Sequence, residues 1–247
     1  MIRKITIALI LALCVFSCRA SFGEDGNALL KRLDKNLNPE SYEFYRKLIN
    51  IEPDGNKKEF ILYAVKKGHD KVVALFLSPA SERGRSTLRI GQNYWLYIPS
   101  VRKPIRLTNV QSVVGGVFNN ADIMGIDYSA EYDVEKMSDQ GGSWMLHLKA
   151  NNKSVAYDKL KMVVDKETAL PVKIECMTEA EMLIKTLDFK KTKDFGEGIV
   201  RPSVIESESP LQQGYKSIMI FSEIKRRKLS DEVFTINYMP RIESLQK

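Results

Sequence analysis

The stretch YEFYRKLINIEPDGNKKEFILYAVKKGHDKVVALFL, which spans positions 42–77, decides the fold class. It holds three apolar runs, at 42–52, 59–65 and 72–77, and these are separated by the turn-forming segments PDGN (53–56) and KGHD (67–70). Short apolar runs divided by glycine, proline and asparagine are typical of antiparallel strands joined by tight turns. The stretch therefore predicts an antiparallel meander.

The same rhythm continues almost to the C-terminus. Further strand-like runs lie at 87–90, 94–98, 105–108, 128–136, 144–150, 157–164, 172–177, 182–189, 199–206 and 215–224. About a dozen strands with few helices indicate a mainly β protein, built as a barrel or a strongly curved sheet. We find no internal repeat and no linker rich in proline, glycine or serine, so we expect a single domain.

Two segments depart from this rhythm. Before the first strand, leucines 29, 30, 33 and 37 share one face at helical spacing, and Asn38-Pro39 ends the pattern, which predicts an amphipathic helix. Segment 113–126 contains two adjacent glycines and two adjacent asparagines. It indicates a flexible loop followed by a helical turn or two, capped by Asn119 or Asn120.

The N-terminus indicates export. Arg3 and Lys4 precede an apolar run at 5–16, broken only by Thr6, and small or polar residues follow. This order is typical of a secretory signal, and the run is shorter than the roughly 20 residues of a membrane-spanning helix. We therefore expect residues 1–23 to be a signal peptide and residues 24–247 to form the exported domain.

The processing point has two interpretations. A signal peptidase could cut after Ala20 or Gly23, since small residues occupy the required positions at both. Alternatively VFSC at 15–18 is a relaxed lipobox with a bulky Phe16, and Cys18 becomes an acylated N-terminus. A single acyl chain anchors a protein only marginally, so the exported domain would be soluble or loosely tethered.

The charge is modest once the leader is set aside. The whole chain carries 38 basic and 31 acidic residues, for a net charge of +7, and removing Arg3, Lys4 and Arg19 leaves 35 against 31, or +4. This balance does not favour a nucleic-acid partner. The basic residues gather locally, and the cluster is either a solvated face or a docking surface for a membrane or an acidic partner: Arg83, Arg85, Arg89, Arg102, Lys103 and Arg106.

Catalytic and metal-binding patterns are missing from the sequence. The two histidines, His69 and His147, belong to no spaced cluster of the kind that binds zinc. Cys176 alternates in phase with Val172 and Ile174, which predicts a buried core residue rather than a nucleophile. We expect no enzyme activity, no metal and no cofactor, with an uncharacterised hydrolase as the minor alternative.

Three strand-like runs, at 73–77, 94–98 and 218–221, are apolar on both faces. A strand in a single-layer sheet usually alternates, because one side meets water. These runs therefore need cover on both sides. An ordinary two-layer core would supply it, and so would a helix on one face and a hydrophobic cavity on the other.

Residues 81–107, SERGRSTLRIGQNYWLYIPSVRKPIRL, carry a resemblance to a known family. They are followed by GGVFNNAD at 115–122 and by LSDEVFT at 229–235. Together these segments resemble the LolA-like outer-membrane lipoprotein-sorting proteins. The resemblance implies an unclosed antiparallel β-barrel of about 11 strands, with a few helices forming a lid over a hydrophobic cavity.

By the same resemblance, the chain would be a periplasmic carrier or chaperone that takes acyl chains of lipoproteins or other lipids toward the outer membrane. Its partners would be an inner-membrane ABC or RND-type exporter and an outer-membrane acceptor; the rival is a non-catalytic adaptor or structural component of an envelope export complex. The expected cavity and lid residues are Leu88, Ile90, Tyr94, Trp95, Tyr97, Phe118, Ile123 and Met124. The expected docking residues are Arg83, Arg85, Arg102 and Lys103.

Overall fold

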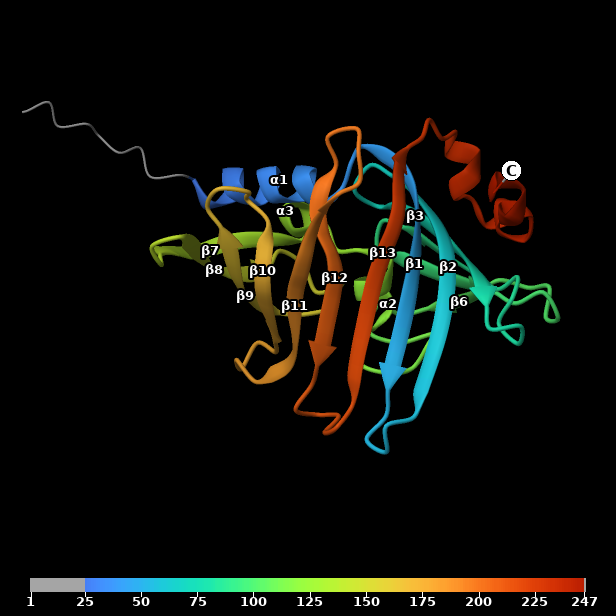
Figure 1. Ribbon diagram of the computed structural model, residues 1–247, viewed down its shortest axis with the longest axis horizontal. Helices are drawn as coiled ribbons and strands as arrows, with labels where there is room; N and C mark the ends of the chain where they lie inside the picture. The colour runs from blue at the N-terminus through green and yellow to red at the C-terminus, as the bar shows by residue number, and fades with distance from the viewer. Residues whose placement is uncertain (1–24, 247) are drawn as a thin grey trace, which may run out of the picture.

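The fold is one strongly curved antiparallel sheet (Figure 1). The computed structural model describes residues 25–246, so the expected signal peptide and Cys18 lie outside the described residues. Within this part the strand order is β6-β5-β4-β3-β2-β1-β13-β12-β11-β10-β9-β8-β7, and the sheet does not close. The strands are β1 Ser41–Ile51, β2 Lys57–Lys67, β3 Lys71–Ser78, β4 Ser86–Ile90, β5 Asn93–Tyr97, β6 Ile105–Leu107, β7 Tyr132–Asp139, β8 Ser143–Ala150, β9 Lys159–Asp165, β10 Pro171–Met177, β11 Leu183–Asp194, β12 Val200–Glu208 and β13 Lys216–Arg226.

The expected mainly β class and unclosed barrel are confirmed, although the sheet has thirteen strands where about 11 were expected. Each apolar run of the sequence forms a strand. One run begins late: residues 128–131 form a helical turn, α3 (Tyr128–Glu131), because the Asp127 side chain caps it by accepting from the Ala130 amide.

The predicted N-terminal helix is also confirmed. α1 spans Gly26–Leu37, Asp25 caps its first turn, and its four spaced leucines are buried. α1 packs against α3 and contacts both β7 and β12, which lie five places apart in the sheet order. The sheet must therefore curl beneath α1 (Figure 1). The main hydrophobic core fills its concave side.

The C-terminal segment covers part of the outer face. Two 3-10 helices, η1 (Asp231–Phe234) and η2 (Ile236–Gln246), lie against β3 and β4, and η2 also reaches β5 (Figure 1). Val73 and Leu75 point toward this segment and belong to a second buried cluster, whereas Ala74 and Phe76 point into the concave side. The runs at 73–77 and 94–98 are therefore apolar on both faces because both faces are covered.

No helix in residues 25–246 is long and apolar enough to cross a membrane.

Candidate functional site

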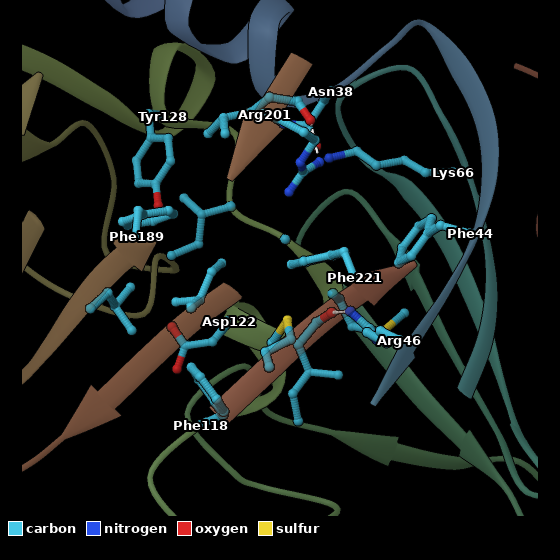
Figure 2. A pocket seen from close by; sticks show the side chains of 18 of the residues that line it. Asn38, Phe44, Arg46, Lys66, Phe118, Asp122, Tyr128, Phe189, Arg201 and Phe221 are labelled. Carbon is cyan, nitrogen blue, oxygen red and sulfur yellow. Dashed lines mark hydrogen bonds between the residues drawn. The ribbon is translucent and has the colours of Figure 1, made fainter. Parts of the chain in front are cut away.

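A pocket lies on the concave side, between the sheet and segment 118–128 (Figure 2). Its cavity volume is about 70 Å³. Most of its lining is apolar or aromatic: Leu37, Tyr42, Phe44, Phe118, Ile123, Met124, Ile126, Tyr128, Leu187, Phe189, Ile205, Met219 and Phe221. The remaining lining residues are Gly125 and five polar ones, Asn38, Arg46, Lys66, Asp122 and Arg201.

Strand alternation places the wall residues. Successive side chains of a strand point to opposite faces, so every second residue of β1, including Phe44 and Arg46, faces inward. On the neighbouring strand β13, Phe221 lies opposite Arg46 and Met219 lies opposite Leu48. Two central strands therefore present one continuous, largely apolar wall.

The short helix α2 (Asn120–Met124) forms the facing side of the pocket. Asn119 accepts from the Asp122 amide at 3.0 Å, and Asp122 accepts from the Asn119 amide at 3.0 Å, which completes a capping box. This confirms the predicted helical turn and its cap. Phe118, Ile123 and Met124 are buried, and all three line the pocket.

Buried cations fasten the segment around α2 to the sheet. Lys185 on β11 donates to the Val117 carbonyl and pairs with Asp122, its ammonium lying 2.9 Å from the carboxylate. Arg46 donates to the Ile123 carbonyl, and Arg89 on β4 donates to the Gly125 carbonyl. A charged donor bonded to a carbonyl is stronger than a neutral one. The sequence predicted a flexible loop here, but the structure shows a segment that is hydrogen-bonded to strands β1, β4 and β11.

A glycine turn brings this segment close to the sheet. Gly116 has φ of 68°, and a Cβ placed on it would lie 2.2 Å from the Asn50 carboxamide oxygen. Asn50 in turn donates to the Val114 carbonyl at 2.9 Å, and Ser217 accepts from the Val117 amide at 2.8 Å. Only glycine combines this backbone conformation with such close approach.

Three cations in the pocket make no ion pair within the described residues: Arg46, Lys66 and Arg201. Burial lowers the pKa of Arg46 to about 10, and it lowers the pKa of Arg201 as well. Burial, helped by the nearby charge of Arg89, lowers the pKa of Lys66 to about 8. Near neutral pH Lys66 is therefore still mostly protonated, inside a largely apolar pocket.

The sequence did not single out these pocket cations, although a signal existed. Arg46 alternates in phase with the buried Phe44 and Leu48, and Lys66 with Leu62 and Ala64. A charged residue in the inward phase of an apolar strand departs from the usual pattern of such strands. Such a departure is a recognisable mark of a site.

The expected cavity residues divide into two groups. Phe118, Ile123 and Met124 line the pocket, and Tyr94 shares the concave side, where it packs 5.6 Å from the Arg89 guanidinium. The other four are not in the pocket, so their placement there was wrong. They belong to the outer cluster beneath the C-terminal segment: Leu88, Ile90, Trp95 and Tyr97.

The reason is register. Leu88 lies opposite Trp95, and Ser86 lies opposite Tyr97, so these side chains share one face of the sheet. Thr87 and the residues in phase with it occupy the other face. Composition showed that both faces are apolar, but which face meets the cavity depends on the direction in which the sheet curls.

The expected docking residues also divide. Arg83 is exposed, while Arg85 is half-buried, pairs with Glu82 and lies 5.3 Å from the Phe76 ring. Arg102 and Lys103 are exposed in the loop between β5 and β6. Arg89, which the sequence grouped with them, is buried: its guanidinium lies 2.5 Å from the Glu131 carboxylate, on the concave side.

The catalytic and metal-binding chemistry of the site is sparse. In residues 25–246, no three His, Cys, Asp or Glu side chains lie together as a metal site would require. Cys176 is a fully buried core residue, as predicted, and burial raises the pKa of its thiol well above the usual value. The pocket thus offers an apolar wall and buried cations.

Comparison with known proteins identifies this architecture. A solved LolA superfamily protein from Nitrosomonas europaea superposes with a TM-score of 0.77 at 27% identity, covering 85% of this chain and 97% of its own. A family model described only as an uncharacterized protein matches residues 68–241, well over half of the chain. The chain belongs to the LolA-like family.

Two further structures share the LolA-like fold. A DUF1329 family protein from Desulfovibrio piger has a TM-score of 0.76 at 20% identity, covering 87% of this chain and 97% of its own. An outer membrane lipoprotein-sorting protein domain from Vibrio parahaemolyticus has a TM-score of 0.72 at 18% identity, covering 86% and 97%. No curated protein sequence matches the chain.

Proposed function

We propose that this LolA-like protein is a periplasmic carrier, which binds acyl chains of lipoproteins or other lipids in the pocket and delivers them toward the outer membrane. The observation that carries the proposal is the pocket itself, a largely apolar cavity between the concave face of one curved sheet and the helix α2. The cavity itself, at about 70 Å³, is smaller than the roughly 300–1,000 Å³ of sites that enclose small ligands, so in our proposal it widens when a chain enters. The signal-like N-terminus supports export.

Burial of hydrocarbon supplies the affinity. Each methylene that leaves water gains about 0.8 kcal/mol, so a chain of a dozen carbons gains enough to offset the ordering that binding requires. Carriage needs no chemical step. In our proposal the protein makes and breaks no covalent bond, and α2 moves aside to admit and release the chain.

Release of the bound chain requires that the hydrogen bond between Arg46 and α2 break. Arg46 donates to the Ile123 carbonyl, and Lys185 pairs with Asp122 of the same helix. These bonds come from two different strands, β1 and β11. A change in the curl of the sheet would move the two strands relative to each other and loosen both bonds.

The test uses two matched isoleucines on neighbouring strands. Ile205 on β12 lines the pocket, whereas Ile220 on β13 points to the outer face. We expect Ile205→Trp to fill the pocket and weaken displacement of a fluorescent fatty acid at least tenfold, and Ile220→Trp to leave it unchanged. Native mass spectrometry of the wild-type protein should show bound lipid. Equal affinity in both variants, or no lipid in either assay, would remove the proposal.

The exposed loop between β5 and β6 favours a second candidate, an adaptor within an envelope export complex. Its Arg102 and Lys103 extend into solvent and suit an acidic partner such as an exporter subunit. A joint Arg102→Glu and Lys103→Glu variant should lose the partner in a pull-down with lipid-free protein while keeping lipid affinity. If only pocket variants lose the partner, the loop is not the docking surface.

A further inference from the structure

We propose that the pocket selects lipids with an anionic headgroup, whose carboxylate or phosphate oxygens lie between the Lys66 ammonium and the Arg201 guanidinium. This inference rests on the proposed carrier function and names the class of cargo. It is carried by the two cations themselves, which come from strands β2 and β12 and meet at one end of the pocket (Figure 2).

Both cations are buried and incompletely bonded. Lys66 is 2% exposed and Arg201 is 5% exposed. The Lys66 ammonium has no hydrogen-bond acceptor, and neither does the Arg201 Nε, although another nitrogen of Arg201 donates to the Leu37 carbonyl. Burying a charge without a partner costs several kcal/mol, and a buried unsatisfied group in a native protein calls for an explanation such as a missing ligand.

The two cations also face each other. In Figure 2 the Lys66 side chain extends toward the Arg201 guanidinium, and the positive charge of Arg201 is one of the causes that lower the pKa of Lys66. Two like charges brought together in an apolar pocket repel. An anion placed between them would replace this repulsion with two charge-assisted hydrogen bonds.

The neighbouring carboxylates are already engaged by other groups. Asp34 accepts from the Tyr128 and Ser129 amides, at 3.1 Å and 2.6 Å, and Asp127 caps α3. Asp34 and Asp127 lie near enough to favour the charged form of Lys66, but neither bonds to its ammonium. The acids of this region therefore bond to backbone amides and not to Lys66 or Arg201.

Two more acids on the concave side are paired. Asp122 bonds to Lys185 and accepts from the Tyr157 hydroxyl at 2.8 Å, and Glu131 bonds to Arg89. Each has a cation of its own. The surplus of positive charge in the pocket is thus confined to the three cations without an ion pair.

The pocket has the polarity of a lipid. In Figure 2 Lys66 and Arg201 lie with Asn38 at one end, and Phe118 lies at the opposite end. The Phe221 ring packs 4.5 Å from the Arg201 guanidinium and continues the wall from the polar to the apolar part. A headgroup at the Asn38 end would leave its chain extended along Phe221 toward Phe118.

The polar end also adjoins the surface. Asn38 lines both the pocket and a neighbouring hollow, which the exposed residues Lys35, Glu40 and Val200 border. This arrangement gives a polar headgroup a route past the end of α1. Arg46 also has two nitrogens without an acceptor, but Figure 2 places it on the α2 side of the pocket, away from Asn38, so we do not assign it to the headgroup.

The experiment compares three probes with the same sixteen-carbon chain: hexadecanoate, hexadecyl phosphate and the neutral hexadecanol. Each displaces a fluorescent alkyl probe from the exported domain at pH 7, below its micelle concentration. We expect at least one anionic probe to bind ten times more tightly than hexadecanol, or better. The tighter of the two anions separates a fatty-acid carboxylate from a lipid phosphate.

Two variants assign the preference to the cations. Lys66→Met should abolish most of the anionic preference while leaving hexadecanol affinity within twofold, because this ammonium holds no other group in place. Arg201→Met should act in the same direction, although it also removes the bond to Leu37. Lys57→Met, an exposed lysine on the same strand, is the control and should change nothing.

The outcomes separate this inference from the carrier function. Equal affinity for all three probes, or an anionic preference that survives in Lys66→Met, would overturn the headgroup assignment and leave the carrier function standing. Failure of every probe to bind would overturn both.

Discussion

Replacing Lys66 with methionine should stabilise the protein, by an amount that depends on pH. The unfolded chain holds the proton of this lysine with a pKa of 10.5, and the folded chain with a pKa of about 8. Each unit of difference corresponds to about 1.4 kcal/mol, so the charged ammonium lowers the free energy of unfolding by about 3 kcal/mol at pH 7. Methionine has similar length and carries no charge to bury.

The direction of the pH dependence follows from proton counting. Between pH 8 and pH 10.5 the unfolded chain holds a proton on Lys66 that the folded chain has released. Where the unfolded state binds more protons, stability rises with pH. The wild type should therefore gain stability across this range, and its deficit relative to Lys66→Met should shrink by about 2 kcal/mol between pH 7 and pH 10.

Urea unfolding at pH 7 and at pH 10 measures this deficit, with Lys57→Met as the control for loss of an exposed lysine. Other lysines and tyrosines titrate over the same range, but they are common to all variants, so the difference between variants isolates Lys66. A deficit of the same size at both pH values would refute the reasoning. So would a Lys66→Met protein that is less stable than the wild type at pH 7, because the ammonium would then have a stabilising partner.

The remaining predictions concern the frame around the pocket, and unfolding free energies from urea titration check each of them. Gly116→Ala should lower the free energy of unfolding by about 3 kcal/mol, because the added Cβ would collide with the Asn50 carboxamide. Gly115→Ala has a similar positive φ but open space around it, so it should lower the free energy of unfolding by only about 1 kcal/mol. Equal losses in the two variants would show that the collision is not the cause. Phe234→Ala should cost about 3–5 kcal/mol in the outer cluster without changing fatty-acid affinity, and reduced affinity in the folded variant would contradict the separation of the two faces. Arg89→Met should cost about 3–5 kcal/mol by leaving Glu131 buried and unpaired, and adding Glu131→Gln should recover part of that loss if the pair is what matters.

The pocket cations imply a balance between stability and function. A chain selected for stability alone would place apolar residues at positions 66 and 201, since well-packed apolar residues often outperform buried charges. Native proteins commonly retain destabilising groups where activity needs them. This is why the same substitution, Lys66→Met, is expected to raise the free energy of unfolding and to weaken binding of an anionic lipid.

Local sequence patterns were sufficient to predict the strands and helices. Alternation and turn residues located every strand, and leucine spacing located α1. A helical turn capped by Asn119 or Asn120 was predicted, because a cap bonds to residues only a few positions along the chain. These features depend on neighbours along the chain, which any reader of the sequence can see. Phe118, Ile123 and Met124, which the family resemblance assigned to the cavity and lid, do line the pocket.

Only the tertiary structure decided which apolar face is the pocket. Trp95 and Tyr94 are adjacent and both aromatic, yet one packs beneath the C-terminal segment and the other faces the concave side. Their assignment depends on the direction of curl and on a segment more than 130 residues away, η2, which covers the outer face. Neither is encoded in the strand itself.

The meeting of Lys66 and Arg201 was equally out of reach of the sequence. These residues are far apart in the chain and lie on β2 and β12, with β1 and β13 between them. In a flat sheet, strands about 4.8 Å apart would hold their backbones roughly 14 Å from each other, with parallel side chains. Curvature tilts inward-pointing side chains toward one another, so these two strand residues converge at one end of the pocket.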